Sequence, residues 1–213
     1  MAPSMNFKTV ALLLGSLLAA MPAFSQPIIG HFVSFGVTGG VGLTDAFSNQ
    51  TVMSVDVDTH YFSGSKDYIV GPTIEVHLPL RLSVELDALY RPLNLTVRNT
   101  IVSSPPIITS VSSKLNSWEF PLLAKYRLPS HLITPFIEAG PSFRSVTNES
   151  FAGTQLSGAG FTAGVGMEGK LGPIRIAPAV RYTRWGADSD LNVSMLNPRS
   201  NLNQAEFLVG LTF

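Results

Sequence analysis

Residues 206–213 read EFLVGLTF and end the chain on an aromatic side chain. In an extended strand, Phe207, Val209, Leu211 and Phe213 fall on one face, and the residues between them fall on the other. At the edge of a sheet in water, such a strand would invite another chain to pair with it. A closed sheet has no such edge, so this stretch predicts the last strand of a barrel, with seven similar strands before it.

Seven earlier segments also alternate apolar and polar side chains, which indicates strands. The predicted strands are residues 32–43, 68–80, 82–91, 117–128, 135–144, 161–171, 174–183 and 203–213. Short turns at 79–81, 129–133 and 172–173 alternate with long segments at 44–67, 92–116, 145–159 and 186–202. This order predicts an all-β, eight-stranded antiparallel up-and-down transmembrane β-barrel with four long external loops and three short periplasmic turns.

The second long segment contains further apolar residues that could continue the strands on either side of it. Residues 93–97 and 107–111 are expected to form a hairpin beyond the membrane, tipped by residues 103–106. Pro72, Pro121, Pro141 and Pro178 fall inside strands and each removes a ladder donor. They leave the local register open, and bulges next to Gly71 and Gly140 would accommodate two of them.

The charged residues of the predicted strands all share the face opposite the apolar side chains. Only 13% of the chain is charged, and an Arg or Lys facing lipid near mid-bilayer costs roughly 2–4 kcal/mol. We therefore expect the apolar face to meet lipid and the charges to pair inside a narrow lumen. The expected lumen network is Glu75, Glu85, Asp87, Arg91, Glu119, Lys125, Arg127, Glu138, Arg144, Glu168, Lys170, Arg175, Arg181 and Glu206.

A soluble lipocalin-like barrel has the same alternation but turns its apolar face inward. Aromatic residues argue against it, because six of them lie on the apolar face at the strand ends next to long segments. They predict an interfacial girdle made of Tyr68, Tyr90, Trp118, Phe143, Phe161 and Tyr182.

Residues 1–25 have the features of a secretory signal peptide, with Lys8 before an apolar run, then Pro22 and small residues before Gln26. Whether translation starts at Met1 or Met5 stays open. Residues 26–213 are then expected to form the barrel domain. The chain has no cysteine, so no disulfide stabilises it. Its zero net charge argues against nucleic acid as a partner.

Three stretches carry a family resemblance: GPTIEVHLPLRLSVELDALYR (71–91), WEFPLLAKYRL (118–128) and FIEAGPSFR (136–144). They resemble the bacterial outer-membrane β-barrel domain family, small porin-like proteins related in architecture to the OmpA membrane domain and OmpX. The resemblance implies the fold and a place in the Gram-negative outer membrane. It also implies that the terminal strand with Phe207, Val209, Leu211 and Phe213 is the signal for the barrel-assembly machinery.

The expected function is a non-enzymatic outer-membrane barrel with a side-chain-filled lumen and a structural or surface-binding role through its loops. Its expected partners are outer-membrane lipid, the assembly machinery and an extracellular ligand that the sequence does not identify. We expect no cofactor, no catalytic residue and no metal site.

The alternative function is an outer-membrane hydrolase acting on lipid A or peptide at the external rim. Asp56, Asp58 and His60 could present ligands to a divalent cation, although a solvated loop is the simpler interpretation. His60 is the one histidine on the external side, so the hydrolase depends on a single loop residue.

Overall fold

The computed structural model describes residues 32–53, 57–63, 68–101, 103, 106–130, 132–147, 158–186 and 201–213. The predicted signal peptide lies outside the described residues, as do His31, Asp56 and His131. Among the residues described, no helix is both long and apolar enough to cross a membrane.

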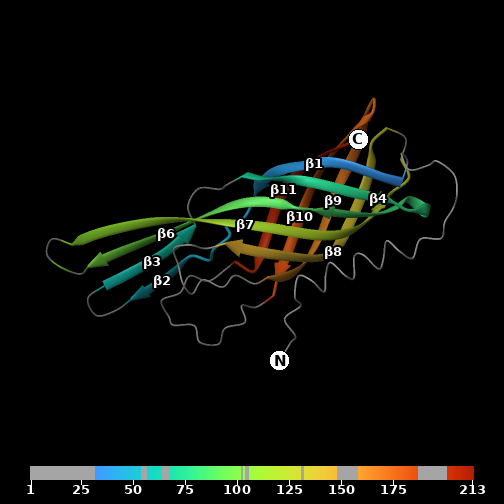
Figure 1. Ribbon diagram of the computed structural model, residues 1–213. Coiled ribbons are helices and arrows are strands. Elements are labelled where there is room, and N and C mark those ends of the chain that lie inside the picture. The colour runs from blue at the N-terminus through green and yellow to red at the C-terminus, as the bar shows by residue number, and fades with distance from the viewer. Residues whose placement is uncertain are drawn as a thin grey trace. The chain divides into compact units, whose positions relative to one another are not determined.

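The described strands form a closed, eight-stranded antiparallel β-barrel, as the sequence predicted (Figure 1). The barrel strands are β1 (Val33–Gly42), β4 (Tyr68–His77), β5 (Leu82–Asp87) continued by β6 (Leu89–Ile101), β7 (Ile107–Arg127), β8 (Thr134–Thr147), β9 (Ala159–Leu171), β10 (Ile174–Trp185) and β11 (Asn203–Thr212). β1 pairs with both β4 and β11, so the sheet has closed on itself.

Side chains alternate between the outside and the lumen along every barrel strand, with the apolar set outside. On β9, Val165 is 60% exposed, whereas Glu85 of β5 and Arg181 of β10 are 3% and 4% exposed. This orientation excludes the lipocalin-like alternative, which needs the apolar side chains inside. Lipid can therefore cover the outer face while the charged residues stay away from it.

The in-strand prolines leave the register regular. Thr73 pairs with Asp87 and Val70 pairs with Tyr90, and these two pairs flank Pro72. The same number of residues separates the pairs on both strands, so no residue is inserted. The same holds between Pro121↔Ser142 and Ala124↔Ala139. The bulges expected next to Gly71 and Gly140 are therefore wrong. The missing proline donors interrupt the ladder without inserting a residue.

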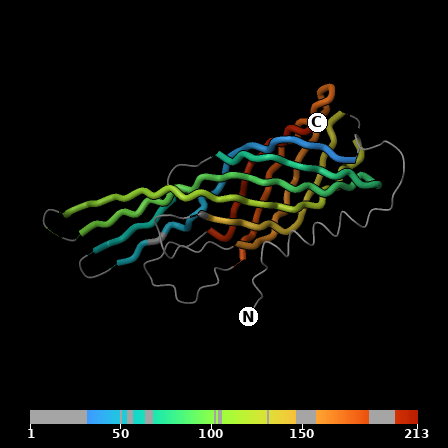
Figure 2. The backbone as a smooth tube through the Cα atoms, viewed as in Figure 1, coloured from blue at the N-terminus to red at the C-terminus, as the bar shows by residue number. Residues whose placement is uncertain are grey.

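Beyond the barrel, β6 and β7 continue as a hairpin whose last pair is Ile101↔Ile107, as expected from the sequence. β7 stops pairing with β8 at Asn116↔Thr147, so the hairpin leaves the barrel there. Figure 2 shows these strands running on from the long-loop end of the barrel.

Two strands within the first long segment, β2 (Gln50–Met53) and β3 (Val57–Ser63), join this hairpin in the order β7-β6-β3-β2. Neither strand was predicted from the sequence. We call the four strands beyond the barrel the protruding sheet: β2, β3, residues 93–101 of β6 and residues 107–115 of β7. A small core of Ala46, Phe47, Leu93, Leu95 and Leu115 supports its base.

The opposite end of the barrel has only short connections. The first contains a single 3-10 turn, η1 (Pro79–Arg81), in which Leu80 and Arg81 both adopt positive φ angles of 63° and 65°. Gly172, in the turn between β9 and β10, has φ 62°, and glycine adopts this conformation without strain because it has no Cβ. The long-loop and short-turn ends therefore lie where the connection lengths predicted.

Candidate functional site

The lumen is organised around Arg181, whose guanidinium binds three carboxylates from two other parts of the sheet. Its Nε donates to Oε1 of Glu138 at 2.5 Å, Nη1 donates to Oδ2 of Asp87 at 2.5 Å, and Nη2 donates to Oε1 of Glu85 at 2.5 Å. β10, β8 and β5 are not neighbours in the sheet. Arg181 therefore ties together walls of the barrel that the hydrogen-bonded ladder does not join.

Lys125 adds a second cation to this central cluster. Its ammonium pairs with Glu85 and lies 3.9 Å from Glu75 and 3.8 Å from Glu138. It also lies 4.6 Å from the centroid of the Phe136 ring, a distance at which a cation is attracted to the aromatic face. Two cations thus share four carboxylates, and all six side chains are buried.

A further cluster closes the lumen toward the short turns. Arg127 donates from Nη2 to Oε1 of Glu75 at 2.5 Å and from Nε to Oε2 of Glu168 at 2.9 Å. Arg175 lies 3.8 Å from Glu168 and bonds Ser34 and the ring of His77.

The third cluster lies toward the long-loop end. Arg91 donates to Glu206 at 2.8 Å and to Gln204 at 3.1 Å, and lies 3.9 Å from Glu119. Arg144 stacks 4.1 Å from the ring of Trp185, which is 2% exposed. Among the described residues, Glu119 Oε1 and Trp185 Nε1 are buried polar atoms without a hydrogen-bond partner.

Very little space remains between these side chains. The cavity lined by Thr38, Glu75, Glu85, Lys125 and Arg181 has a volume of about 20 Å³, room for about one water molecule. A lumen so filled does not form a wide aqueous channel.

The structure places thirteen of the fourteen residues of the expected network in the buried or half-buried lumen. The exception is Lys170, which lies on the same face of β9 as Glu168 but is exposed near the end of the strand. Polar residues that the sequence analysis did not include also join the lumen. Thr73 links Thr38 to Asp87 at 2.6 Å each, and Thr162 links Ser142 to Thr183 at 2.6 and 2.7 Å.

Trp185 and Gln204 were also missed. Trp185 lies two residues beyond the predicted end of its strand, yet it continues the inward face of Arg181 and Thr183. Extending the alternation past Thr183 would have identified it.

The six aromatic residues expected in the girdle all lie on the outer face. Three of them form a continuous row, with ring centroids of Tyr68 and Tyr90 6.3 Å apart and those of Tyr90 and Trp118 5.4 Å apart. The hydroxyls of Tyr90 and Tyr182 donate to Asn116 and Asn203. Such a row, apolar on one side and hydrogen-bonded on the other, fits a lipid–water boundary.

In the terminal strand, Phe207, Leu211 and Phe213 are 40%, 45% and 72% exposed on the outer face, and Val209 lies between them. Its backbone is paired with β1 and β10. The folded barrel thus leaves the apolar face of this strand accessible from the membrane side.

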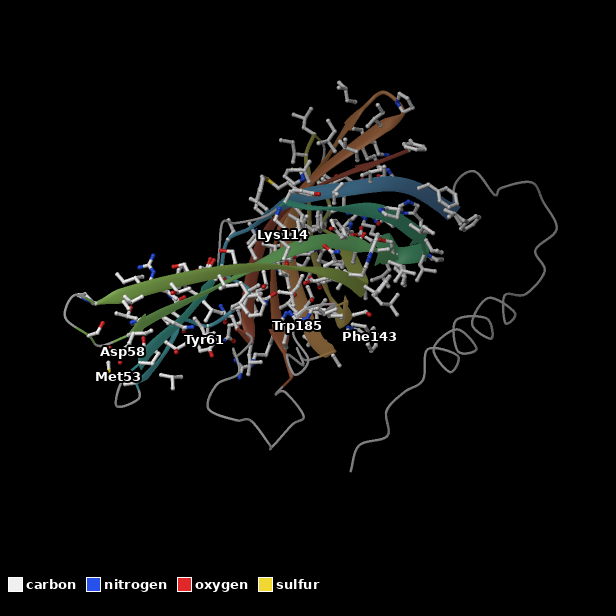
Figure 3. All side chains as sticks on the ribbon, turned by 60° about the vertical axis from the view of Figure 1, so that its left-hand side comes forward. Met53, Asp58, Tyr61, Lys114, Phe143 and Trp185 are labelled. Atoms are coloured by element: carbon white, nitrogen blue, oxygen red, sulfur yellow. The ribbon has the colours of Figure 1, made fainter. Side chains whose placement is uncertain are left out.

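The protruding sheet lies beyond the barrel and carries exposed side chains. Figure 3 shows Met53, Asp58 and Tyr61 along it, while Trp185 and Phe143 lie on the barrel. His60 is here, with Nδ1 hydrogen-bonded to Thr51 Oγ1 at 3.0 Å. Among the described residues, no group of three His, Asp or Glu side chains could hold a metal ion.

The sequence family described as "Outer membrane protein beta-barrel domain" matches residues 23–197. No curated protein matches the chain. Among solved structures, the outer membrane protein OprG from Pseudomonas aeruginosa is similar, with 16% identity and a TM-score of 0.53 over 84% of this chain and 94% of OprG. Neisserial surface protein A (NspA) matches with 11% identity and a TM-score of 0.49, over 85% of this chain and 95% of NspA.

Proposed function

Because this chain belongs to the outer membrane protein beta-barrel domain family and is a bacterial outer-membrane β-barrel, we propose that it is a non-enzymatic surface-binding protein. In this role, the filled barrel is a rigid anchor, and the protruding sheet presents a binding surface outside the cell.

The observation that carries this proposal is the protruding sheet itself. In barrels of this kind the long connections face the outside and the short turns face the periplasm. The sheet continues from β6 and β7 at the long-loop end, so its hydrogen-bonded ladder holds its strands in fixed positions relative to the anchor. A binding surface on such a sheet loses less conformational entropy on binding than a flexible loop would.

The filled lumen argues for an anchor and against a diffusion pore. Three clusters of ion pairs, around Arg127, Arg181 and Arg91, lie along the lumen. Ion-paired side chains that cross a narrow barrel leave no continuous water path. We therefore assign the binding role to the external surface.

Single cysteines test the orientation, because the natural chain has none. Ser112 lies on the protruding sheet and Ser130 on a short turn, and both are exposed. In intact cells, a membrane-impermeant maleimide should label Ser112→Cys and leave Ser130→Cys unlabelled. After permeabilisation, both should react. Labelling of Ser130→Cys alone in intact cells would place the sheet in the periplasm and contradict the proposal.

Two further measurements separate this role from the other functions. Purified protein in a planar bilayer should give no large stepwise conductance. Lipid A from cells with and without the protein should be identical, because we assign no hydrolytic step to the chain. A shortened lipid A acyl pattern that depends on His60 would favour the hydrolase instead.

A further inference from the structure

The far end of the β6–β7 hairpin exposes large aliphatic side chains. Ile101, Ile107 and Ile108 are 39%, 55% and 62% exposed, and Ile101 and Ile107 form the last pair of the ladder. The sequence carries no charge from residue 99 to residue 113. Exposed aliphatic residues in such a group mark a surface that some partner covers.

These side chains point to both faces of the sheet. Ile107 and Ile101 are directly opposite each other and share one face, whereas Ile108 is the next residue along β7 and points to the other. A protein that docks on a sheet covers one face, and a strand that pairs with the edge of β7 covers neither. An apolar liquid covers both faces at once.

We propose that this hairpin end inserts into the surface of an apposed lipid bilayer, and the inference rests on the external position assigned above. Ile101, Ile107 and Ile108 would lie at the boundary between head groups and acyl chains. Ile101 pairs with Ile107 in the last row and Thr100 pairs with Ile108 in the next, while Thr109 and Ser110 lie farther back, so only the last two rows of the hairpin enter. These pairings satisfy backbone groups of the two rows within the hairpin.

The charges behind the tip have opposite signs. Asp58 pairs with Thr100 and therefore lies in the same row as Ile108, two strands away from it, while Arg98 pairs with Ser110 two rows farther from the tip. The charges of these two side chains largely offset each other. The apolar side chains should therefore set the affinity, with little dependence on lipid charge or salt.

Flotation tests the proposal with the full-length barrel in nanodiscs. The probes are vesicles of phosphatidylcholine alone and vesicles of phosphatidylcholine with one-fifth phosphatidylglycerol, which are floated on a sucrose gradient. Empty nanodiscs measure the background. We expect the protein to float with both vesicle types at low and high salt. Ile107→Asp and Ile108→Asp should each lower the fraction of protein bound to vesicles at least about tenfold. Each replaces an aliphatic side chain that is inserted in lipid in the bound state with a charge.

Ser112→Asp is the matched control. It lies on the same strand and face as Ile108, is also exposed, and is four residues, or about 13 Å, farther from the tip. Its bound fraction should stay within about twofold of the natural protein, and heat-modifiable gel mobility shows that every variant has folded.

Three results would overturn the proposal. If the natural protein floats with neither vesicle type, the hairpin end does not insert into lipid, and a protein ligand that pairs with β7 becomes the better explanation. Loss of vesicle binding with Ile108→Asp but not with Ile107→Asp would show that the vesicle contacts only one face of the hairpin. Binding that requires phosphatidylglycerol and disappears in salt would show that charge carries it. The external position is tested separately by labelling Ser112→Cys in intact cells, so either proposal can fail alone.

Discussion

Arg181 shows what a single residue contributes inside this barrel. Its guanidinium is the shared partner of Glu85, Asp87 and Glu138 and is almost fully buried. A buried ion pair is weak evidence for stability when compared with an apolar core, but removal of one partner leaves the others charged and unpaired. The cluster therefore makes the barrel intolerant of single changes at this position.

We expect Arg181→Met to lower the free energy of unfolding by about 3–5 kcal/mol, because three carboxylates lose their common partner. Urea unfolding in lipid vesicles, followed by heat-modifiable gel mobility, measures this change. Arg184→Met is the control: Arg184 lies three residues along the same strand, is exposed and bonds Asn203. It should shift the free energy by no more than about 0.5 kcal/mol. Equal effects of the two substitutions would contradict the central role of Arg181.

Gly164 makes the crossing of the lumen by Arg181 possible. A Cβ at this position would lie 2.8 Å from Glu138 Oε1 and 3.0 Å from Arg181 Cγ. The hydrogen bond that Arg181 Nε donates to Glu138 Oε1 holds both side chains in place. Gly166 makes room for the Phe136 ring instead of for a charged side chain. The glycines of the inner face thus fit particular neighbours.

Gly164→Val should therefore cost about 1–3 kcal/mol of unfolding free energy, because the added side chain displaces Glu138 or Arg181. Gly169 provides the matched control on the same strand, since a Cβ there would have no neighbour within 4 Å. Gly169→Val should leave the urea midpoint unchanged or slightly higher. A Gly164→Val barrel as stable as the natural one would show that the cluster can rearrange.

At the scale of the element, the first short turn stores backbone strain. Leu80 has φ 63° and ψ 28°, a left-handed conformation that costs a side-chain-bearing residue about 1–2 kcal/mol. Asparagine adopts this conformation more readily.

Leu80→Asn should therefore raise the free energy of unfolding by about 1 kcal/mol. Leu132, which is 92% exposed in another short turn and is not among the residues with positive φ, supplies the control. Leu132→Asn should give no gain in the same urea experiment. A gain from both substitutions would mean that reduced surface hydrophobicity, not relief of strain, is responsible.

The strands could be predicted from the sequence because lipid and lumen impose opposite demands on alternate residues. Val84 and Glu85 are neighbours in the chain, yet one faces outward and the other lies in the ion-paired centre. The β6–β7 hairpin was also predictable, since its apolar residues continue the pattern.

Strands β2 and β3 could not be predicted in the same way. β3 pairs with β6 along one edge and with β2 along the other, and most β3 side chains are half-buried, so this environment imposes only a weak alternation on residues such as Val57 and Tyr61. The ion-pair partners were beyond the sequence as well. The alternation of side chains along each strand places Arg181, Glu85 and Glu138 in the lumen. It does not predict which charges pair across the lumen, because strand tilt and stagger set the height of each side chain.

At the scale of the whole molecule, the charged residues are divided among three clusters along the lumen. The cluster around Arg181 and Lys125 lies between the Arg127 cluster near the short turns and the Arg91 cluster near the long loops. Because the three clusters lie one after another along the lumen, each is expected to block the passage of ions without the others. We therefore expect all three clusters together to set the resistance of the barrel to ions.

We accordingly expect both the natural protein and the charge-neutral double variant Arg181→Ala/Glu85→Ala to show no resolved conductance in planar bilayers. The double substitution removes one cation and one anion, so the central cluster is thinned while its net charge is kept. Arg127 with Glu168, and Arg91 with Glu206, still fill the lumen on either side. Single-channel recording in concentrated KCl is the measurement, made on protein whose heat-modifiable mobility shows a folded barrel. Discrete openings in this variant, absent from Arg91→Ala/Glu206→Ala, would instead make the central cluster the sole barrier, with the outer two clusters permeable to ions.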